Sequence, residues 1–185
     1  MRPRQPLPAI WLVTDERQGE TLWPALDQLP RGSGIVFRHY RTPPPERRRL
    51  FERIRRIALA RHLTLVLADS PQRASAWRAD GVHGRSKRRA GRPMLRTTPA
   101  HGRRELLAAL STRADLIFLS PVFPTRSHPA GRTLGVVRFG MAARGAPRVV
   151  ALGGMDEARG RRLAALGSYG WAAIDAFGEG GRLRT

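Results

Sequence analysis

Short apolar runs recur along the whole chain, and most of them are followed by a turn and then by a helical pattern. Several runs are continuously apolar and rich in β-branched residues, which is typical of strands that are buried on both faces of a parallel sheet. The runs predict eight strands, at residues 10–14, 34–38, 63–67, 81–83, 93–95, 116–119, 148–152 and 171–174.

The clearest predicted helix begins at the prolines before Glu46. Proline suits the first turn of a helix, and glutamate suits the positive end of the helix dipole. The apolar residues of this segment share one face at helical spacing, and we place the arginines of residues 47–56 off that face, in solvent. Weaker helical patterns cover residues 20–29, 71–79, 103–110, 136–143 and 157–166.

Alternation of strand and helix predicts an α/β fold, a compact (β/α)₈ TIM barrel that forms a single domain over residues 1–185. The 185 residues leave about 23 for each of eight units, which is short for a fold that usually needs at least ~200 residues. We therefore expect shortened helices, above all after the fourth and fifth strands, where residues 84–92 are rich in Arg and Gly. An open doubly wound sheet is the alternative, although no G-x-G-x-x-G turn follows a strand.

The basic charge of the chain comes almost entirely from arginine. Lys and Arg together number 34 against 14 Asp and Glu, which gives a net charge of +20, and Lys87 is the only lysine. A surface that binds nucleic acid normally uses both cations. The near absence of lysine indicates a bias on the whole sequence, so we expect no nucleic-acid partner.

Cysteine usage and hydropathy exclude several further classes. The chain has no cysteine, which excludes disulfides, thiolate metal sites and a cysteine nucleophile. Prolines occupy the N-terminal segment where a signal peptide needs an apolar helix, and no apolar stretch approaches the ~18 residues of a membrane span. We expect a cytoplasmic protein without a membrane partner.

Polar residues gather where the predicted strands end, which is where (β/α)₈ barrels build their sites. Asp15 and Asp69 each follow a strand, and a carboxylate there can hold Mg²⁺ or cap the next helix. The pair Gly153-Gly154 lets backbone amides approach a phosphate, although an ordinary tight turn would use the same residues. His83 and His101 can bind substrate, move protons or simply complete the barrel through hydrogen bonds.

The order of these motifs resembles the thiamine phosphate synthase and TenI superfamily. The segments Ala79-Asp80-Gly81-Val82-His83 and Pro121-Val122-Phe123-Pro124-Thr125 are specific when they occur together, and the match spans about residues 10–177. The resemblance implies a compact (β/α)₈ barrel. In the synthases of this superfamily, a pyrimidine pyrophosphate is joined to a thiazole phosphate with release of pyrophosphate.

The resemblance also implies roles for individual residues. Arg38 would contact the pyrophosphate and act in catalysis, and Asp69 would hold a Mg²⁺ ion that neutralises the leaving group. His83 would lie near the pyrimidine of a phosphorylated small-molecule substrate. His128, at the position of a family lysine, would be the second catalytic residue. The residues expected to face the thiazole and its phosphate are Thr125, Ser127, Gly153 and Gly154.

The chain departs from the family pattern close to these residues. Val36 and Tyr40 replace the Gln and Lys that flank the arginine, and Ala68 replaces the Asn before the aspartate. A basic segment that ends in Arg88 replaces the Gly-Gln-x-Asp motif, so the second metal carboxylate is missing. Three further substitutions place Pro99, His128 and Asp175 where the family has Ser, Lys and Ser.

Two functions follow from these observations. The first is a thiamine phosphate synthase-like transferase of thiamine biosynthesis, impaired by the loss of charged groups, each of which is worth about 10²- to 10³-fold in rate. The alternative is a catalytically degenerate protein on the same fold. Such a protein would bind a phosphate ligand in the barrel, or an acidic partner or RNA through the arginines of residues 47–56.

Overall fold

Eight parallel strands form one closed barrel in a computed structural model, which describes residues 6–86, 88, 91–112, 114–125, 131–146 and 148–177. Each strand pairs with its neighbours in the sequence, and the last strand pairs with the first. The closed barrel confirms the predicted (β/α)₈ fold and rules out the open sheet. The strands are β1 (Ile10–Val13), β2 (Gly34–Phe37), β3 (Thr64–Leu67), β4 (Gly81–His83), β5 (Leu95–Ala100), β6 (Leu116–Leu119), β7 (Val149–Leu152) and β8 (Gly170–Ala173).

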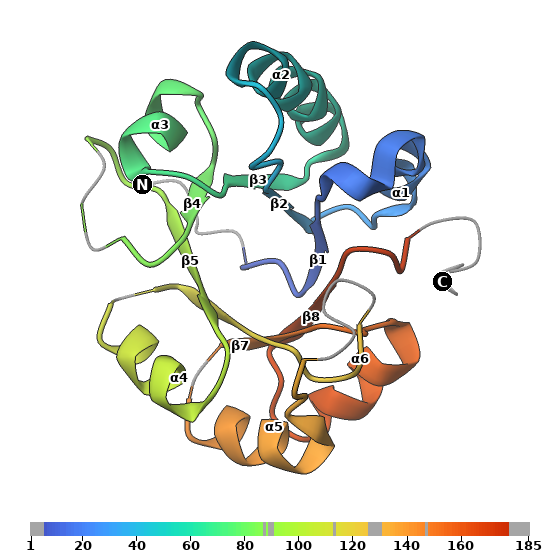
Figure 1. Ribbon diagram of the computed structural model, residues 1–185, viewed down its shortest axis with the longest axis vertical. Coiled ribbons are helices and arrows are strands. Elements are labelled where there is room, and N and C mark those ends of the chain that lie inside the picture. The colour runs from blue at the N-terminus through green and yellow to red at the C-terminus, as the bar shows by residue number, and fades with distance from the viewer. Residues whose placement is uncertain are drawn as a thin grey trace.

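Helices surround the strands, as Figure 1 shows. They are the 3₁₀ helix η1 (Glu16–Thr21) and the α-helices α1 (Leu22–Gln28), α2 (Pro44–Arg61), α3 (Pro71–Ala76), α4 (Arg103–Leu110), α5 (Gly135–Arg144) and α6 (Glu157–Ala164). No helix lies among the described residues between β4 and β5, where we expected a shortened connection. Within the described ranges, no helix is long and apolar enough to span a bilayer.

Two apolar layers explain why the strands are apolar at successive positions, because neighbouring strand residues point to opposite faces. One layer fills the barrel, where Trp11 and Phe118 meet edge to face with ring centroids 5.3 Å apart. Gly34 makes room for this packing, since a Cβ at this position would lie 2.2 Å from the Trp11 ring. The other layer packs between the barrel and the helices and includes Phe37, Phe51 and Phe139.

The fifth strand lies further along the chain than the prediction. We expected it at residues 93–95, but it covers Leu95–Ala100 and pairs with β6 through Thr97, Thr98, Pro99 and Ala100. The two threonines are buried in the barrel wall although they are polar, and Pro99 keeps a place in the strand although it has no N–H to donate. Hydropathy alone therefore could not locate this strand.

Candidate functional site

A cavity of about 440 Å³ opens at the carboxyl end of the barrel, where the predicted site residues gather. Arg38, His83, Thr125 and Gly153 line it, whereas Gly154 lines a second, neighbouring cavity of about 360 Å³. Other polar side chains of the main cavity are those of Tyr40, His101, Ser120 and Arg132. No carboxylate is among its described lining residues. Ser127 and His128 lie outside the residues that the structure describes, so their roles stay predictions.

The local backbone fixes the position of Arg38, which follows β2. Its N–H donates to the Thr14 hydroxyl at 3.1 Å, and that hydroxyl lies 2.9 Å from Nδ1 of His39. His39 takes a left-handed conformation with φ of 37° and stacks on Phe37 at 4.8 Å between ring centroids. Burial lowers the pKa of His39 below its usual value. A neutral, buried histidine thus anchors the turn that carries Arg38.

Among the described residues, the Arg38 guanidinium has one ionic partner, and the contact is loose. Its Nη2 lies 3.5 Å from Oδ2 of Asp15, whereas the other oxygen of Asp15 accepts from Nε of Arg17 at 2.6 Å. Burial opposes ionisation of Asp15, but the hydrogen bonds from Arg17 and the charges of both arginines outweigh it and hold the pKa of Asp15 below its usual value. Asp15 also caps η1 in a capping box with Gln18, which confirms its interpretation as a helix cap.

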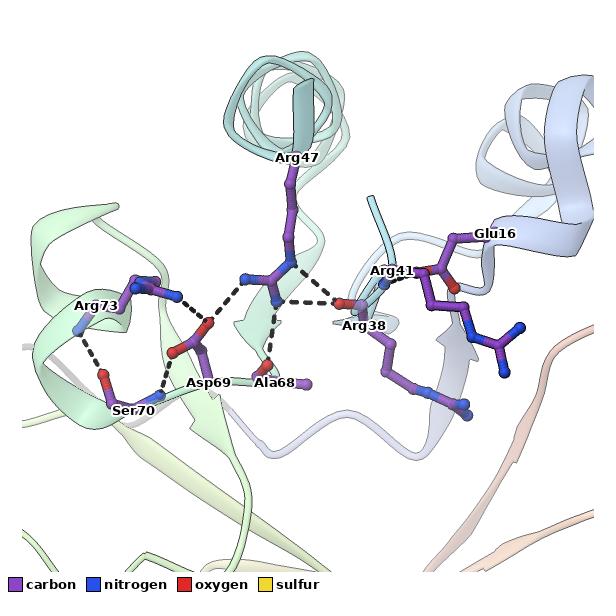
Figure 2. A network of polar contacts seen from close by, with 8 residues as sticks. All are labelled: Glu16, Arg38, Arg41, Arg47, Ala68, Asp69, Ser70 and Arg73. Atoms are coloured by element: carbon purple, nitrogen blue, oxygen red, sulfur yellow. Dashed lines mark hydrogen bonds and ion pairs between the residues drawn. The ribbon is translucent and has the colours of Figure 1, made fainter. Parts of the chain in front are cut away.

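Asp69, the predicted metal ligand, lies between two arginines (Figure 2). Its Oδ2 accepts from Nη1 of Arg47 at 2.7 Å and from Nη1 of Arg73 at 3.0 Å. Its Oδ1 accepts from the N–H of Ser70 at 2.7 Å. Burial opposes ionisation of Asp69, but these hydrogen bonds and the charge of Arg73 outweigh it and hold its pKa below the usual value. Asp69 is therefore an ionised carboxylate that already has cationic partners.

Arg47 is buried, and the prediction that placed it in solvent on α2 is wrong. Only 6% of the residue is exposed, and its guanidinium lies 5.5 Å from the Phe37 ring centroid and 5.4 Å from that of Trp77. Nε and Nη2 donate to the Arg38 carbonyl at 3.3 and 3.0 Å, and Nη2 also donates to the Ala68 carbonyl at 3.1 Å. Arg47 thus links the ends of β2 and β3, as Figure 2 shows.

The residues around Asp69 do not fit a Mg²⁺ ion. Mg²⁺ takes octahedral oxygen ligands, usually including one or two carboxylates, and both oxygens of Asp69 are engaged by donors. No group of three or more His, Asp or Glu side chains that could hold a metal occurs among the described residues. Arg88, within the segment that replaces the family's second carboxylate, donates its backbone N–H to Ser86 Oγ at 3.2 Å. The expected cofactor has no support from this geometry.

His83 presents a neutral imidazole to the main cavity. Its Nδ1 lies 2.8 Å from the Thr97 hydroxyl, and its ring meets Phe118 edge to face at 5.2 Å. Burial, aided by the charge of Arg38, lowers the pKa of His83 to about 3. His101 also lines this cavity, and its Nδ1 lies 3.2 Å from the carbonyl oxygen of Ser120. The barrel thus brings both predicted histidines to one cavity.

Gly153 and Gly154 have the conformation that a close approach requires, with φ of 96° and 60°. The loop after β6 packs directly on them, because a Cβ on Gly153 would lie 2.8 Å from Pro121 Cα and one on Gly154 would lie 2.4 Å from the Pro124 carbonyl oxygen. The N–H of Phe123 donates to the Gly153 carbonyl at 3.0 Å. Packing against this loop therefore requires glycine at both positions, and both glycines also line the cavities of the site.

The second cavity, where the thiazole phosphate was expected, is lined by two carboxylates, Asp156 and Asp175. Asp156 caps α6 by accepting from the N–H of Arg159 at 2.8 Å. The guanidinium of Arg159 lies 3.5 Å from Asp156 Oδ2 and also donates to the Gly154 carbonyl. The one cation among the described lining residues is thus already engaged, and the carboxylates oppose a phosphate at this place.

Sequence reasoning missed Arg132, Asp156 and Arg159. Strand ends drew attention to residues 120–125, but the segment between β6 and α5 extends to residue 134, so Arg132 returns to the same end of the barrel. Asp156 and Arg159 lie at the start of α6, and the only signal in the sequence was an Asp directly before a helical pattern. The site residues that the sequence did not predict therefore lie in a long loop and at a helix cap.

A closed (β/α)₈ barrel with a cationic cavity at its carboxyl end defines the class of barrels that bind small ligands at the ends of their strands. The family model described as thiamine monophosphate synthase, TMP-TENI, matches residues 10–177. The chain therefore belongs to the thiamine monophosphate synthase/TenI family, which confirms the resemblance seen in the sequence.

Relatives in several bacteria share nearly the full length of the chain. It is 28% identical to a putative thiamine-phosphate synthase 2 of Aquifex aeolicus over 94% of this chain and 99% of that protein. It is 25% identical to the thiamine-phosphate synthase of Geobacillus kaustophilus, with 91% and 84% covered. In fold, it is similar to a thiamine phosphate pyrophosphorylase of Pyrococcus furiosus, with a TM-score of 0.73, 24% identity and 92% and 86% of the two chains covered.

Proposed function

We propose that the protein is a transferase of thiamine biosynthesis, which joins a pyrimidine pyrophosphate to a thiazole phosphate and releases pyrophosphate. The main cavity carries this proposal, because Arg38 and Arg132 line it and no carboxylate is among its described lining residues. Membership of the thiamine monophosphate synthase/TenI family supports the choice of substrates. The two relatives above bear the synthase name.

Charge stabilisation is the main work that the reaction requires. The bond breaks between the pyrophosphate oxygen and the carbon of the pyrimidine substrate that carries it, and the bonding electrons leave with pyrophosphate. The thiazole nitrogen forms the new bond to that carbon. Arg38 and Arg132 are the arginines among the described lining residues of the main cavity, and they can receive the developing charge. Each such donor is worth about 10²- to 10³-fold in rate. His128 stays a proposed further donor for the same charge.

The remaining residues of the cavity bind and orient the two rings in this proposal. His83 stays neutral and lies beside the pyrimidine, so it contributes a hydrogen bond and no charge. Thr125, Gly153 and Gly154 lie next to one another at the junction of the two cavities and contact the thiazole, together with Ser127. Apolar side chains such as Val13, Phe118 and Leu152 keep water from the reacting atoms.

Turnover by the purified chain tests the proposal. The two substrates are mixed with the protein, and thiamine phosphate and pyrophosphate are measured by chromatography. We expect both products in equal amounts and a loss of about 10²-fold or more in Arg38→Gln. The matched control is Arg31→Gln, which removes the same charge from an exposed position before β2. Binding of both substrates without any turnover would contradict the proposal and favour the degenerate binding protein.

A further inference from the structure

The carboxylate of Asp69, which was predicted to bind Mg²⁺, already has hydrogen-bond partners within the protein. Both oxygens of Asp69 already accept hydrogen bonds, since Oδ2 is shared by Arg47 and Arg73 and Oδ1 accepts from the Ser70 N–H. We call these four residues the Asp69 clamp, drawn in Figure 2. Metal coordination would have to share Oδ1 with the Ser70 N–H or displace an arginine from Oδ2, and it would add a double positive charge next to two guanidinium groups.

Arg47 cannot move aside to make room for a metal. Its side chain is 7% exposed, and it donates to the Arg38 and Ala68 carbonyls as well as to Asp69. The aromatic rings of Phe37, at the end of β2, and of Trp77, directly after α3, lie near its guanidinium. A buried guanidinium that lost its carboxylate would be an uncompensated charge, which is strongly unfavourable.

The Asp69 clamp and the main cavity are connected but distinct. Asp69 is not among the described residues that line the cavity, whereas Arg38, whose carbonyl accepts from Arg47, is. The Arg38 side chain is 29% exposed, and its contacts among the described residues are loose: Asp15 lies 3.5 Å away and the Tyr40 ring centroid 5.9 Å away. Its guanidinium can therefore turn to a ligand. Arg132, in the segment between β6 and α5, is exposed and lines the same cavity.

We infer that Asp69 is the counter-ion of Arg47 and Arg73 rather than a magnesium ligand, and that Arg38 and Arg132 bind the anionic group of the substrate without a divalent metal. This inference rests on the proposed function for the identity of the ligand, a diphosphate. It assigns the positive charge at the site to arginine side chains. Arg47 serves this site by positioning the end of β2, from which Arg38 reaches the cavity.

Inorganic pyrophosphate is the probe for the first experiment, by isothermal titration calorimetry of the full chain. We expect binding in EDTA, and an affinity in excess Mg²⁺ that is equal or weaker, because the ion competes with the arginines for the ligand. Arg38→Gln should weaken binding in EDTA by about tenfold or more. Binding that Mg²⁺ strengthens by about tenfold or more would overturn the inference.

Direct titration with Mn²⁺, followed by electron paramagnetic resonance, is the second experiment and needs no ligand. We expect no Mn²⁺ site in the wild-type chain with a dissociation constant below about 1 mM. A tighter site that Asp69→Asn abolishes would overturn the inference, while the control Asp27→Asn removes an exposed carboxylate on α1. If Asp69→Asn does not fold, Arg73→Gln takes its place as the test, because it frees Asp69. A wild-type site tighter than about 1 mM that becomes tighter still in Arg73→Gln would also overturn the inference.

The two experiments separate this inference from the proposed function. If pyrophosphate does not bind under either condition, the proposal of a pyrophosphate substrate fails, and the Mn²⁺ titration alone decides whether Asp69 is a metal ligand. If pyrophosphate binds in EDTA but no turnover is seen, the inference stands and the chain is a binding protein. Turnover that needs Mg²⁺, together with a Mn²⁺ site at Asp69, would support the function and overturn the inference.

Discussion

The substitution Arg47→Met tests whether the buried arginine joins the ends of β2 and β3. Methionine keeps an apolar stem of similar length near Phe37 and Trp77, so the change removes the charge and the hydrogen bonds with little loss of packing. The variant loses the 2.7 Å ion pair with Asp69 and the bonds to the Arg38 and Ala68 carbonyls.

The expected loss of stability follows from the burial of this pair. Removing one partner of a buried ion pair costs about 3–5 kcal/mol. Asp69 keeps Arg73 and the Ser70 N–H, and 17% of its side chain is exposed, so we expect the lower end, about 3 kcal/mol. A chain of this size loses about 2–4 °C for each kcal/mol, and the midpoint of thermal unfolding should fall by about 6–12 °C.

Urea and thermal unfolding at pH 7 measure this change. The control Arg49→Met removes an arginine of the same helix whose side chain is 74% exposed and 3.7 Å from Glu46, and it should cost no more than about 0.5 kcal/mol. Combining Arg47→Met with Asp69→Asn should cost less than the sum of the single changes, by about 0.5–3 kcal/mol. An Arg47→Met variant as stable as the control would refute the reasoning.

Three further predictions concern charge at the site. Asp175→Ser should strengthen binding of the thiazole phosphate by about tenfold, because it removes a carboxylate near the proposed phosphate position; calorimetry beside the wild-type chain measures it, and unchanged affinity would count against phosphate at the second cavity. The pKa of Asp69 is lowered in the fold, so the stability it provides is complete above about pH 4 and is lost as the pH falls further. Urea titrations should show a flatter acid limb in Asp69→Asn. The pKa of His83 is lowered to about 3, so stability should decline as the pH drops below about 6.5, where the unfolded chain takes up the proton. His83→Gln should reduce that decline, and an identical pH profile would argue against a neutral His83.

The barrel was predictable from the sequence because its strands are apolar on both faces and its turns are polar. The runs around Leu12, Val36 and Val150 point into the barrel and out of it at alternate positions, and hydropathy registers both. Hydropathy did not locate the strand that contains Thr97 and Pro99. Thr97 is polar and serves as a hydrogen-bond partner of His83, and Pro99 stays in the strand without donating a hydrogen bond. A polar residue buried for a specific contact has no hydropathy signal.

The site was predictable only as far as strand ends define it. Arg38, His83, Thr125 and Gly153 line one cavity as the sequence led us to expect. The partners of Asp69 were not predictable in the same way, although Arg47 shares helical spacing with Phe51, Ile54 and Ala58, the buried residues of α2. Helical spacing places Arg47 on the buried face, whereas its charge favours a position in solvent. Only the proximity of Asp69 in the folded chain decides between these two positions.

Scarcity of carboxylates connects the composition with the chemistry of the site. With 14 acidic residues against 34 basic ones, the chain uses the aspartates near its cavities as counter-ions: Asp15 for Arg17, Asp69 for Arg47 and Arg73, and Asp156 for Arg159. Of these arginines only Arg47 is buried and needs such a partner, but all of these pairs leave few carboxylates for a metal. Because basic residues are in excess, Arg38 and Arg132 at the main cavity have no closely paired carboxylate among the described residues. In the function proposed for this family member, arginine thus supplies the charge that an anionic ligand requires.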